Sequence, residues 1–186
     1  PFGNDGDFSR RVMIHRMNGD LANDLGNLSQ RVLSMIFKNC SGVMPALPAT
    51  AAPEDSALLD AADAMLGKVR AHMDVQSFHE ALRCIWEVVS DANKYVDTTA
   101  PWGLKKTDPV RMGEVLAVLA ETIRQAAILV QPVMPGSASK ILDQLGVADD
   151  QRGFDMLAGA GRIAAGVEIS KPEPVFPRFV EEEGEV

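Results

Sequence analysis

Apolar side chains recur at steps of three and four residues along several stretches of this 186-residue chain. One such series consists of Met17, Leu21, Leu25, Leu28, Val32 and Met35. A second consists of Phe78, Leu82, Ile85, Val89, Ala92 and Val96. This spacing places the members of each series on one face of an α-helix, whereas a strand would expose and bury its residues alternately. The sequence therefore predicts long amphipathic helices that each bury one face.

Capping residues, prolines and glycines predict where these helices begin and end. Helices are expected from Asp7 or Ser9 onward, over about 54–72, 75–97 and 108–130, and over 137–145 before Gly146. The three prolines within 41–53 predict a linker, and Asn18-Gly19 is expected to bend or divide the first helix. We therefore predict an all-α, antiparallel bundle of four to five helices over residues 1–150, followed by an irregular extension over 151–186 with a frayed acidic end.

Composition and charge exclude several functional classes. With 46% hydrophobic residues and a formal net charge of −8, the chain should bury a core, and it is not a general polyanion binder. Cys40 and Cys84 form no CxxC pair, which favours a reducing, cytoplasmic location over a disulfide framework or a thiolate zinc site. No apolar run is long enough to span a membrane. His15, His72 and His79 lack the partners of a metal site, so structural or solvent-facing roles are expected.

A row of polar side chains borders the apolar face of the first predicted helix. At 100° per residue, Asn23, Asn27 and Arg31 fall on one line, about a quarter turn from the apolar series. One interpretation is that they satisfy carbonyl groups at the edge of the core. The other is that fixed amide and guanidinium groups read the Watson–Crick edge of an unstacked RNA base.

A row of amide and guanidinium groups lacks an aromatic surface on which a base can stack. The stretch TTAPWGLKK at 98–106 offers one. We expect a loop here, in which Trp102 follows a proline and provides an aromatic face for a base, while Lys105 and Lys106 contact phosphates. The alternative is that Trp102 closes the end of the bundle. The second tryptophan, Trp86, lies within a predicted helix and is expected to belong to the core.

Four separated blocks resemble the C-terminal part of methionine–tRNA ligase, a class I aminoacyl-tRNA synthetase. They are NGDLANDLGNLSQRVLSMI at 18–36, ANKYVDTTAPW at 92–102, LVQPVMPGSASKILDQLG at 129–146 and KPEPVFPR at 171–178. The blocks occur in the family's order, and the resemblance covers nearly the whole chain. It implies a helical domain that binds the CAU anticodon of methionine tRNA.

The resemblance also implies roles for individual residues. Asn27, Arg31 and Trp102 match the family positions that recognise the first anticodon base, cytosine. Supporting or phosphate contacts are expected from Asn23, Asn93, Lys94, Lys105 and Lys106, with helix packing as the expected role of Tyr95. The resemblance implies binding to the anticodon loop of a tRNA and to the ligase's own catalytic domain, with no membrane or DNA partner.

The catalytic parts of the family are not found in this sequence. Neither a His-Ile-Gly-His type motif nor a Lys-Met-Ser-Lys-Ser loop occurs in these residues. ATP and methionine are therefore expected to bind a separate catalytic domain, and this piece alone is expected to need no cofactor and to be inactive. The start at Pro1, without Met, likewise suggests a piece of a longer protein, and the extension at 151–186 is expected to pack back toward the catalytic domain.

Two alternatives remain at this stage. The first is the anticodon domain of a related class I synthetase for cysteine, valine, leucine or isoleucine, although GNLSQR together with APW favours methionine. The second is a helical protein-interaction module without an RNA ligand, which the net charge of −8 would suit.

Overall fold

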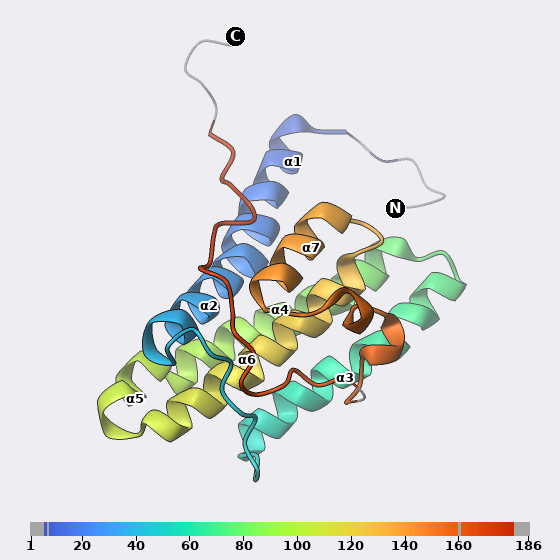
Figure 1. The fold of residues 1–186 in the computed structure, drawn as a ribbon. Coiled ribbons are helices and arrows are strands. Elements are labelled where there is room, and N and C mark those ends of the chain that lie inside the picture. Colours follow the sequence, from blue (N-terminus) through green and yellow to red (C-terminus); the bar gives the residue numbers. More distant parts are fainter. Residues whose placement is uncertain (1–5, 7, 160, 181–186) are drawn as a thin grey trace.

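The computed structural model describes residues 6, 8–159 and 161–180, and these residues form an all-α bundle (Figure 1), as predicted. The helices are α1 (Arg10–Arg16), η1 (Met17–Gly26), α2 (Asn27–Asn39), α3 (Pro53–Asp74), α4 (Phe78–Thr99), α5 (Pro101–Thr107), α6 (Pro109–Val130) and α7 (Pro135–Gln144). Two 3₁₀ turns follow, η2 (Asp149–Gln151) and η3 (Phe154–Met156). The β-pairing of the described part is limited to one isolated bridge between Val43 and Glu168.

Helix α6 forms the centre of the bundle. Every residue from Val115 to Val130 is buried, because this helix is apolar around most of its circumference and is covered by α3, α4, α5, α7 and α2. Its start agrees with the sequence: Asp108 caps the helix by accepting a hydrogen bond from the Arg111 backbone N–H, and Pro109 occupies the first turn. The two long helices α3 and α4 pack against each other and against α6.

The first helical rod is continuous from α1 through η1 to α2, so the expected break at Asn18-Gly19 is absent. Instead, η1 is a π-helix: the backbone N–H of Asn27 bonds to the carbonyl of Ala22, five residues earlier. Each turn of η1 therefore takes more residues than an α-helix turn. The predicted alignment at 100° per residue holds from Asn27 to Arg31 within α2 but fails for Asn23, which lies in η1.

The apolar series of the first rod is buried only toward its C-terminal end. Leu25, Leu28 and Val32 are completely covered, whereas Met17 is 37% exposed and no residue of α1 is buried. Ser9 caps α1 by accepting from the Val12 backbone N–H. The alternative cap, Asp7, and the acidic end at 181–186 lie outside the described residues.

The prediction of a loop around Trp102 was wrong. Ala100 adopts a left-handed conformation with φ of 42°. This single residue ends α4 and changes the direction of the chain before the next helix. Pro101 then supplies a φ suited to the first turn of a helix, and α5 continues to Thr107. Trp102 thus stands on a short helix. A proline at the first position also starts α7 at Pro135, two residues earlier than expected, and Gly146 follows its end with φ of +71°.

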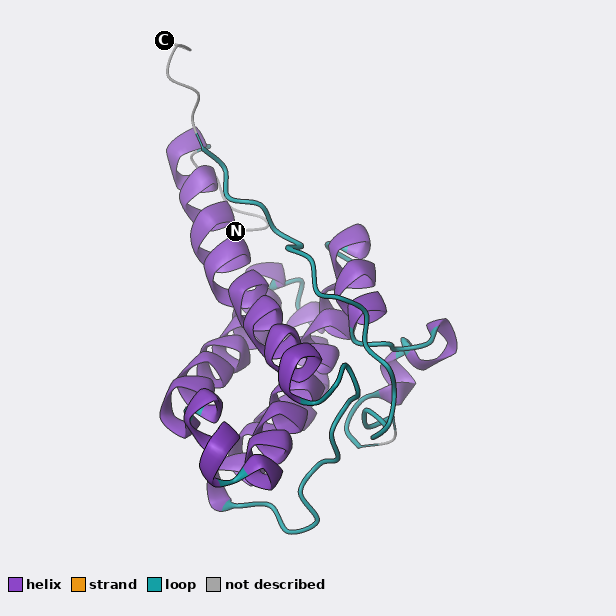
Figure 2. Ribbon diagram, turned by 60° about the vertical axis from the view of Figure 1, so that its left-hand side comes forward, coloured by secondary structure: helices purple, strands orange, loops and turns teal. Residues whose placement is uncertain are grey.

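The C-terminal extension runs beside the first rod in both ribbon views (Figures 1 and 2). Its early part joins the bundle core, since Leu157, Ile163 and Ile169 are buried in the same apolar cluster as α6. A buried ion pair on α6 also fastens it: the Ile163 backbone N–H donates to Glu121 Oε2 at 2.9 Å, and Arg124 Nη2 donates to the Met156 carbonyl at 3.1 Å. Across the described residues, no helix is both long and apolar enough to cross a membrane.

Candidate nucleic-acid interface

Arg31 and Trp102 come together at the end of the bundle where α2 meets α5. The guanidinium carbon of Arg31 lies 5.6 Å from the centre of the Trp102 ring, which is within the range of a cation–π contact. Trp102 keeps 53% of its surface exposed. About half of the indole is therefore open to solvent instead of closing the end of the bundle, and it lies next to a guanidinium that has several N–H donors.

Asp97 is a member of this site that the sequence reasoning missed. Its Oδ1 accepts a hydrogen bond from Arg31 Nη2 at 2.9 Å. Both side chains are substantially exposed, so the ion pair adds little to the stability of the fold. Its effect is to fix the direction of the guanidinium. The available signal was the position of Asp97 near the end of the α4 pattern, five residues before Trp102, where the periodicity by itself indicates only the end of a helix.

Asn27 lies one helical turn before Arg31 on α2 and is exposed. Its side-chain amide forms no hydrogen bond with any described residue, so both its donor and its acceptor face solvent. Asn23 differs, because its Oδ1 accepts from Arg178 Nη2 of the extension at 2.7 Å. The first-rod polar row therefore contains one unengaged amide, one amide tied to the extension and one guanidinium set against an indole.

The predicted supporting residues separate into two groups. Asn93 donates to the Val89 carbonyl of its own helix, and Lys94 pairs with Asp91, so neither makes a polar contact with Arg31 or Trp102. Lys105 and Lys106 lie exposed in the last turn of α5, the helix that carries Trp102. Neither of these two lysines forms an ion pair with a described residue.

A buried polar cluster holds the C-terminal half of α4, just before the site. Asp55 on α3 is fully buried and accepts from Tyr95 Oη at 2.6 Å and from Arg111 Nη1 and Nη2 at 2.6 and 2.7 Å. Burial alone would raise the pKa of Asp55, but the hydrogen bonds from Arg111 and Tyr95 outweigh it and lower that pKa. Burial and the bond to Asp55 raise the pKa of Tyr95 above its ordinary value. Tyr95 thus packs in the core, as expected.

The second tryptophan and the three histidines lie away from the contact between Arg31 and Trp102. Trp86 is half-buried against the core, and its indole N–H donates to the Asp20 carbonyl at 3.0 Å, which joins α4 to η1. Of the three histidines, His15 and His79 are exposed and His72 is half-buried. No group of His, Cys, Asp or Glu that could hold a metal ion occurs among the described residues.

Comparison with known protein families identifies the family of this chain. Residues 45–186 match the anticodon-binding domain of methionyl-tRNA ligase. The chain belongs to this family. The resemblance seen in the sequence is thereby confirmed, and the four blocks that carried it lie on the first rod, the α4–α5 corner, the α6–α7 corner and the extension.

Relatives of this methionyl-tRNA ligase domain are similar over nearly its whole length. The methionine–tRNA ligase of Brucella suis biovar 1 is 52% identical over 182 residues, which are 97% of this chain and 35% of that protein. The enzyme of Rhizobium meliloti is 50% identical, over 96% of this chain and 34% of its own length. The chain thus spans about a third of the curated relatives it matches.

Solved structures agree with this assignment. The apo crystal structure of Mycobacterium tuberculosis methionyl-tRNA synthetase superposes with a TM-score of 0.93 at 46% identity, covering 98% of this chain and 37% of that one. The same enzyme in complex with methionyl-adenylate gives a TM-score of 0.92 at 48% identity, over 96% of this chain and 35% of that one.

Proposed function

We propose that this domain binds the anticodon loop of a tRNA and reads the first base of a CAU anticodon at Asn27, Arg31 and Trp102. The observation that carries the proposal is the contact between Arg31 and a half-exposed Trp102. It joins a stacking surface and hydrogen-bond donors that are far apart in the sequence, and it leaves both accessible. Family membership supplies the class of ligand.

The chemistry of the three side chains suits cytosine. The Watson–Crick edge of cytosine offers two acceptors and one amine donor, which a guanidinium and an amide oxygen can match. Uracil would set its ring N–H against those donors and leave a polar group unpaired, which is the kind of mismatch that gives strong discrimination. Stacking on Trp102 is tolerant of base identity and would supply affinity instead.

Asp97 has a defined part in this reading. It holds one N–H of Arg31 at 2.9 Å and so fixes the orientation of the donors that remain. It also places a negative charge beside the RNA surface, which opposes non-specific binding of phosphates. The exposed Lys105 and Lys106 on α5 would offset that charge for a loop that is seated correctly on Trp102.

In the parent ligase this domain would select the tRNA, while ATP and methionine bind a catalytic domain elsewhere in that protein. The fragment alone would not form methionyl-adenylate. We place the parent enzyme in the cytoplasm, in keeping with a role in charging tRNA for protein synthesis.

The test is a titration of the chain with two RNA hairpins that differ only in carrying CAU or UAU. We expect tighter binding of CAU by about 5- to 150-fold, since one unpaired polar group costs about 1–3 kcal/mol. Asn27→Ala and Arg31→Ala should reduce this ratio, while Asn93→Ala, an amide used within its own helix, should leave it unchanged. Equal affinities for the two hairpins in the unmodified chain would reject cytosine recognition.

A further inference from the structure

Helix α5, which carries Trp102, is held only lightly by its own side chains. Of its seven residues, all of which the structure describes, Pro101 alone is buried, and Leu104 is partly buried against the core. A helix of two turns is also too short to be stable by its own backbone hydrogen bonds. Because α5 joins the end of α4 to the start of α6 (Figure 1), its position is set by these two flanking helices.

One buried carboxylate connects both flanks of α5. Asp55 Oδ1 accepts hydrogen bonds from Tyr95 Oη at 2.6 Å and from Arg111 Nη2 at 2.7 Å, and Asp55 Oδ2 accepts from Arg111 Nη1 at 2.6 Å. Tyr95 lies in the last two turns of α4, and Arg111 lies in the first turn of α6. We call these three residues the Asp55 cluster. It ties the end of the helix before α5 to the start of the helix after it.

The hydrogen bonding of the Asp55 cluster leaves little freedom of movement. A contact from the Ala52 backbone N–H, at 3.1 Å, brings the hydrogen bonds accepted by Asp55 to four, and the carboxylate is fully buried. Water cannot replace a partner that moves away from a fully buried group, so displacement of α4 or α6 would leave a polar atom unpaired. The cluster thereby fixes the separation of α4 and α6, which is the gap that α5 bridges.

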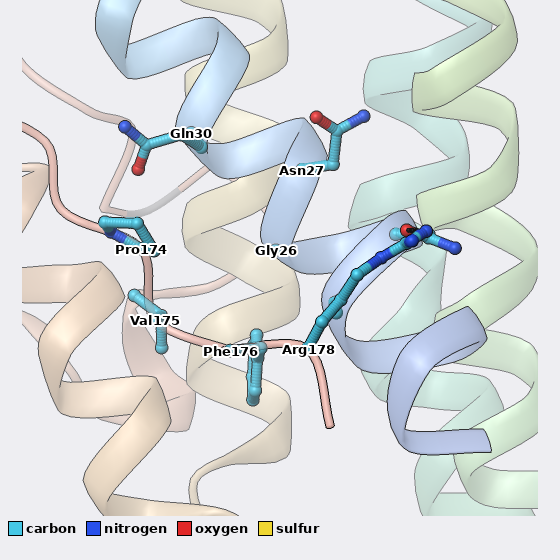
Figure 3. A pocket seen from close by; sticks show the side chains of 9 residues that line it. Gly26, Asn27, Gln30, Pro174, Val175, Phe176 and Arg178 are labelled. Atoms are coloured by element: carbon cyan, nitrogen blue, oxygen red, sulfur yellow. Dashed lines mark hydrogen bonds between the residues drawn. The ribbon is translucent and has the colours of Figure 1, made fainter. Parts of the chain in front are cut away.

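The other half of the proposed site is held independently of this cluster. Asn27 and Arg31 lie on α2, whose apolar face is buried in the core. Residues 174–178 of the extension run beside the start of α2 (Figure 3), and Phe176 packs on Gly26, where a Cβ would lie 3.2 Å from the phenyl ring. Among the described residues, the Asp55 cluster makes no hydrogen bond or ion pair with α2. A displacement of α5 would therefore change the distance between the two halves of the site.

We infer that Asp55, Tyr95 and Arg111 are positioning residues for RNA recognition, because they set where α5 places Trp102 relative to Arg31. This inference rests on the proposed function, and the three residues act through α5 without touching the RNA. The guanidinium carbon of Arg31 lies 5.6 Å from the centre of the Trp102 ring, close to the limit of about 6 Å for a cation–π contact. A displacement of α5 by about 1 Å away from α2 is therefore enough to separate the stacking surface from the hydrogen-bond donors.

The experiment observes Trp102 in the full 186-residue chain, labelled with fluorotryptophan. The chain has two tryptophans, so two fluorine NMR resonances are expected, and the one that is lost in Trp102→Phe belongs to Trp102. Tyr95→Phe keeps the ring and removes only the hydroxyl bonded to Asp55, and it should shift or broaden the Trp102 resonance. The Trp86 resonance should not change, because Trp86 lies nine residues before Tyr95 in α4, about 14 Å along the helix axis.

A second variant and a matched control complete the series. Arg111→Lys should act in the same direction as Tyr95→Phe, because an ammonium group keeps the charge but cannot form the paired contacts of a guanidinium. Thr122→Val is the control, since it also removes one buried hydroxyl that forms a hydrogen bond. Thr122 bonds only within its own helix, eleven residues beyond Arg111 in α6, so its replacement should leave the Trp102 resonance unchanged.

The same variants are then titrated with the CAU hairpin. Tyr95→Phe and Arg111→Lys should weaken binding about two- to fivefold, the worth of one exposed cation–π contact, whereas Thr122→Val should bind as the unmodified chain does. The inference is overturned if the Trp102 resonance or the binding is unchanged in both variants, if Trp86 and Trp102 change equally, or if Thr122→Val has the same effects.

These outcomes distinguish failure of the positioning role from failure of the proposed function. If the unmodified chain still prefers CAU over UAU in those cases, the proposed function stands and only the role of the Asp55 cluster fails. If the unmodified chain binds the two hairpins equally, the proposed function fails, and the role of the cluster in RNA recognition fails with it.

Discussion

Replacing Asp55 with Asn should lower the free energy of unfolding by about 3 kcal/mol at pH 7. Asp55 is fully buried, and it joins α3 to α4 through Tyr95 and to α6 through Arg111. The amide would accept fewer hydrogen bonds from Arg111 and would no longer neutralise its charge. Tyr95 lies two residues before Asp97 and seven before Trp102, so the cluster also holds the end of α4 next to the proposed RNA site.

The magnitude follows from the partners that remain. Removing one member of a buried ion pair costs about 3–5 kcal/mol. We expect the lower end, because Arg111 is 22% exposed and keeps Glu54 at 3.4 Å and Glu114 at 3.5 Å as neighbours. A loss of 3 kcal/mol corresponds to a decrease in Tm of about 6–12 °C for a chain of this size.

Urea unfolding followed by circular dichroism would measure the change. Asp60→Asn, at an exposed position of the same helix, serves as the matched control and should alter stability by less than about 0.5 kcal/mol. A loss below about 1 kcal/mol for Asp55→Asn would contradict the reasoning, because the buried carboxylate would then not be compensating the Arg111 charge.

The pH dependence provides an independent check of the same cluster. The pKa of Asp55 is lowered in the folded protein, so the stability contributed by its ionised form is fully present above the unfolded pKa, near 3.9. That contribution is lost as the pH falls through the lower, folded pKa. The difference in stability between the unmodified chain and Asp55→Asn should therefore narrow below about pH 4. A difference that stays constant from pH 7 to pH 3 would show that the carboxylate is not the source.

Three other changes are expected to act at the surface and at the extension. Trp102→Ala should weaken binding of both CAU and UAU hairpins by about 5- to 100-fold, the loss of one stacked base, as measured by fluorescence anisotropy of labelled RNA. Asp97→Asn should raise the affinity for both hairpins and reduce their ratio, because a negative charge is removed and Arg31 is no longer held; unchanged affinities would count against its placement at the interface. Gly26→Ala should cost about 1–3 kcal/mol and expose the Phe176 side of the extension to limited proteolysis, whereas an unaltered cleavage pattern would mean that the contact is dispensable.

The apolar periodicity was sufficient to predict the bundle because the buried faces are strictly helical in spacing. For α6, the pattern and the Asp108-Pro109 start together gave both ends correctly. The predictions of helix boundaries were wrong where the conformation of a single residue decides whether a helix ends or begins. Pro101 in the sequence predicts a loop that keeps Trp102 out of a helix, yet it begins one, because a proline in the first turn needs no N–H partner. The change of hydrogen-bond spacing in η1 had no clear sequence signal beyond its glycines and asparagines.

The candidate site shows a similar limit. The spacing of α2 correctly put Asn27 and Arg31 one turn apart, and the stretch TTAPWGLKK indicated Trp102 as a stacking surface, but no local pattern could show that Arg31 would meet an indole from another helix. Asp97 was missed for the same reason, since its partner lies 66 residues away in sequence. Asn23 could not be assigned from the first rod alone, because its partner, Arg178, is supplied by the extension.

The π-helical stretch η1 changes the orientation of α1 relative to α2 about the rod axis, compared with the orientation that a continuous α-helix would give. Everything before Met17 is rotated about the rod axis relative to everything after Gly26 by an amount that depends on the number of residues in η1. Deleting one residue there would rotate α1, with its exposed Val12 and Met13, about the rod axis by less than the 100° per residue of an α-helix, because each π-helical turn holds more residues. The orientation of the N-terminal end of the first rod therefore depends on the number of residues in η1, whereas Asn27 and Arg31 are placed by α2 and its packing against α6.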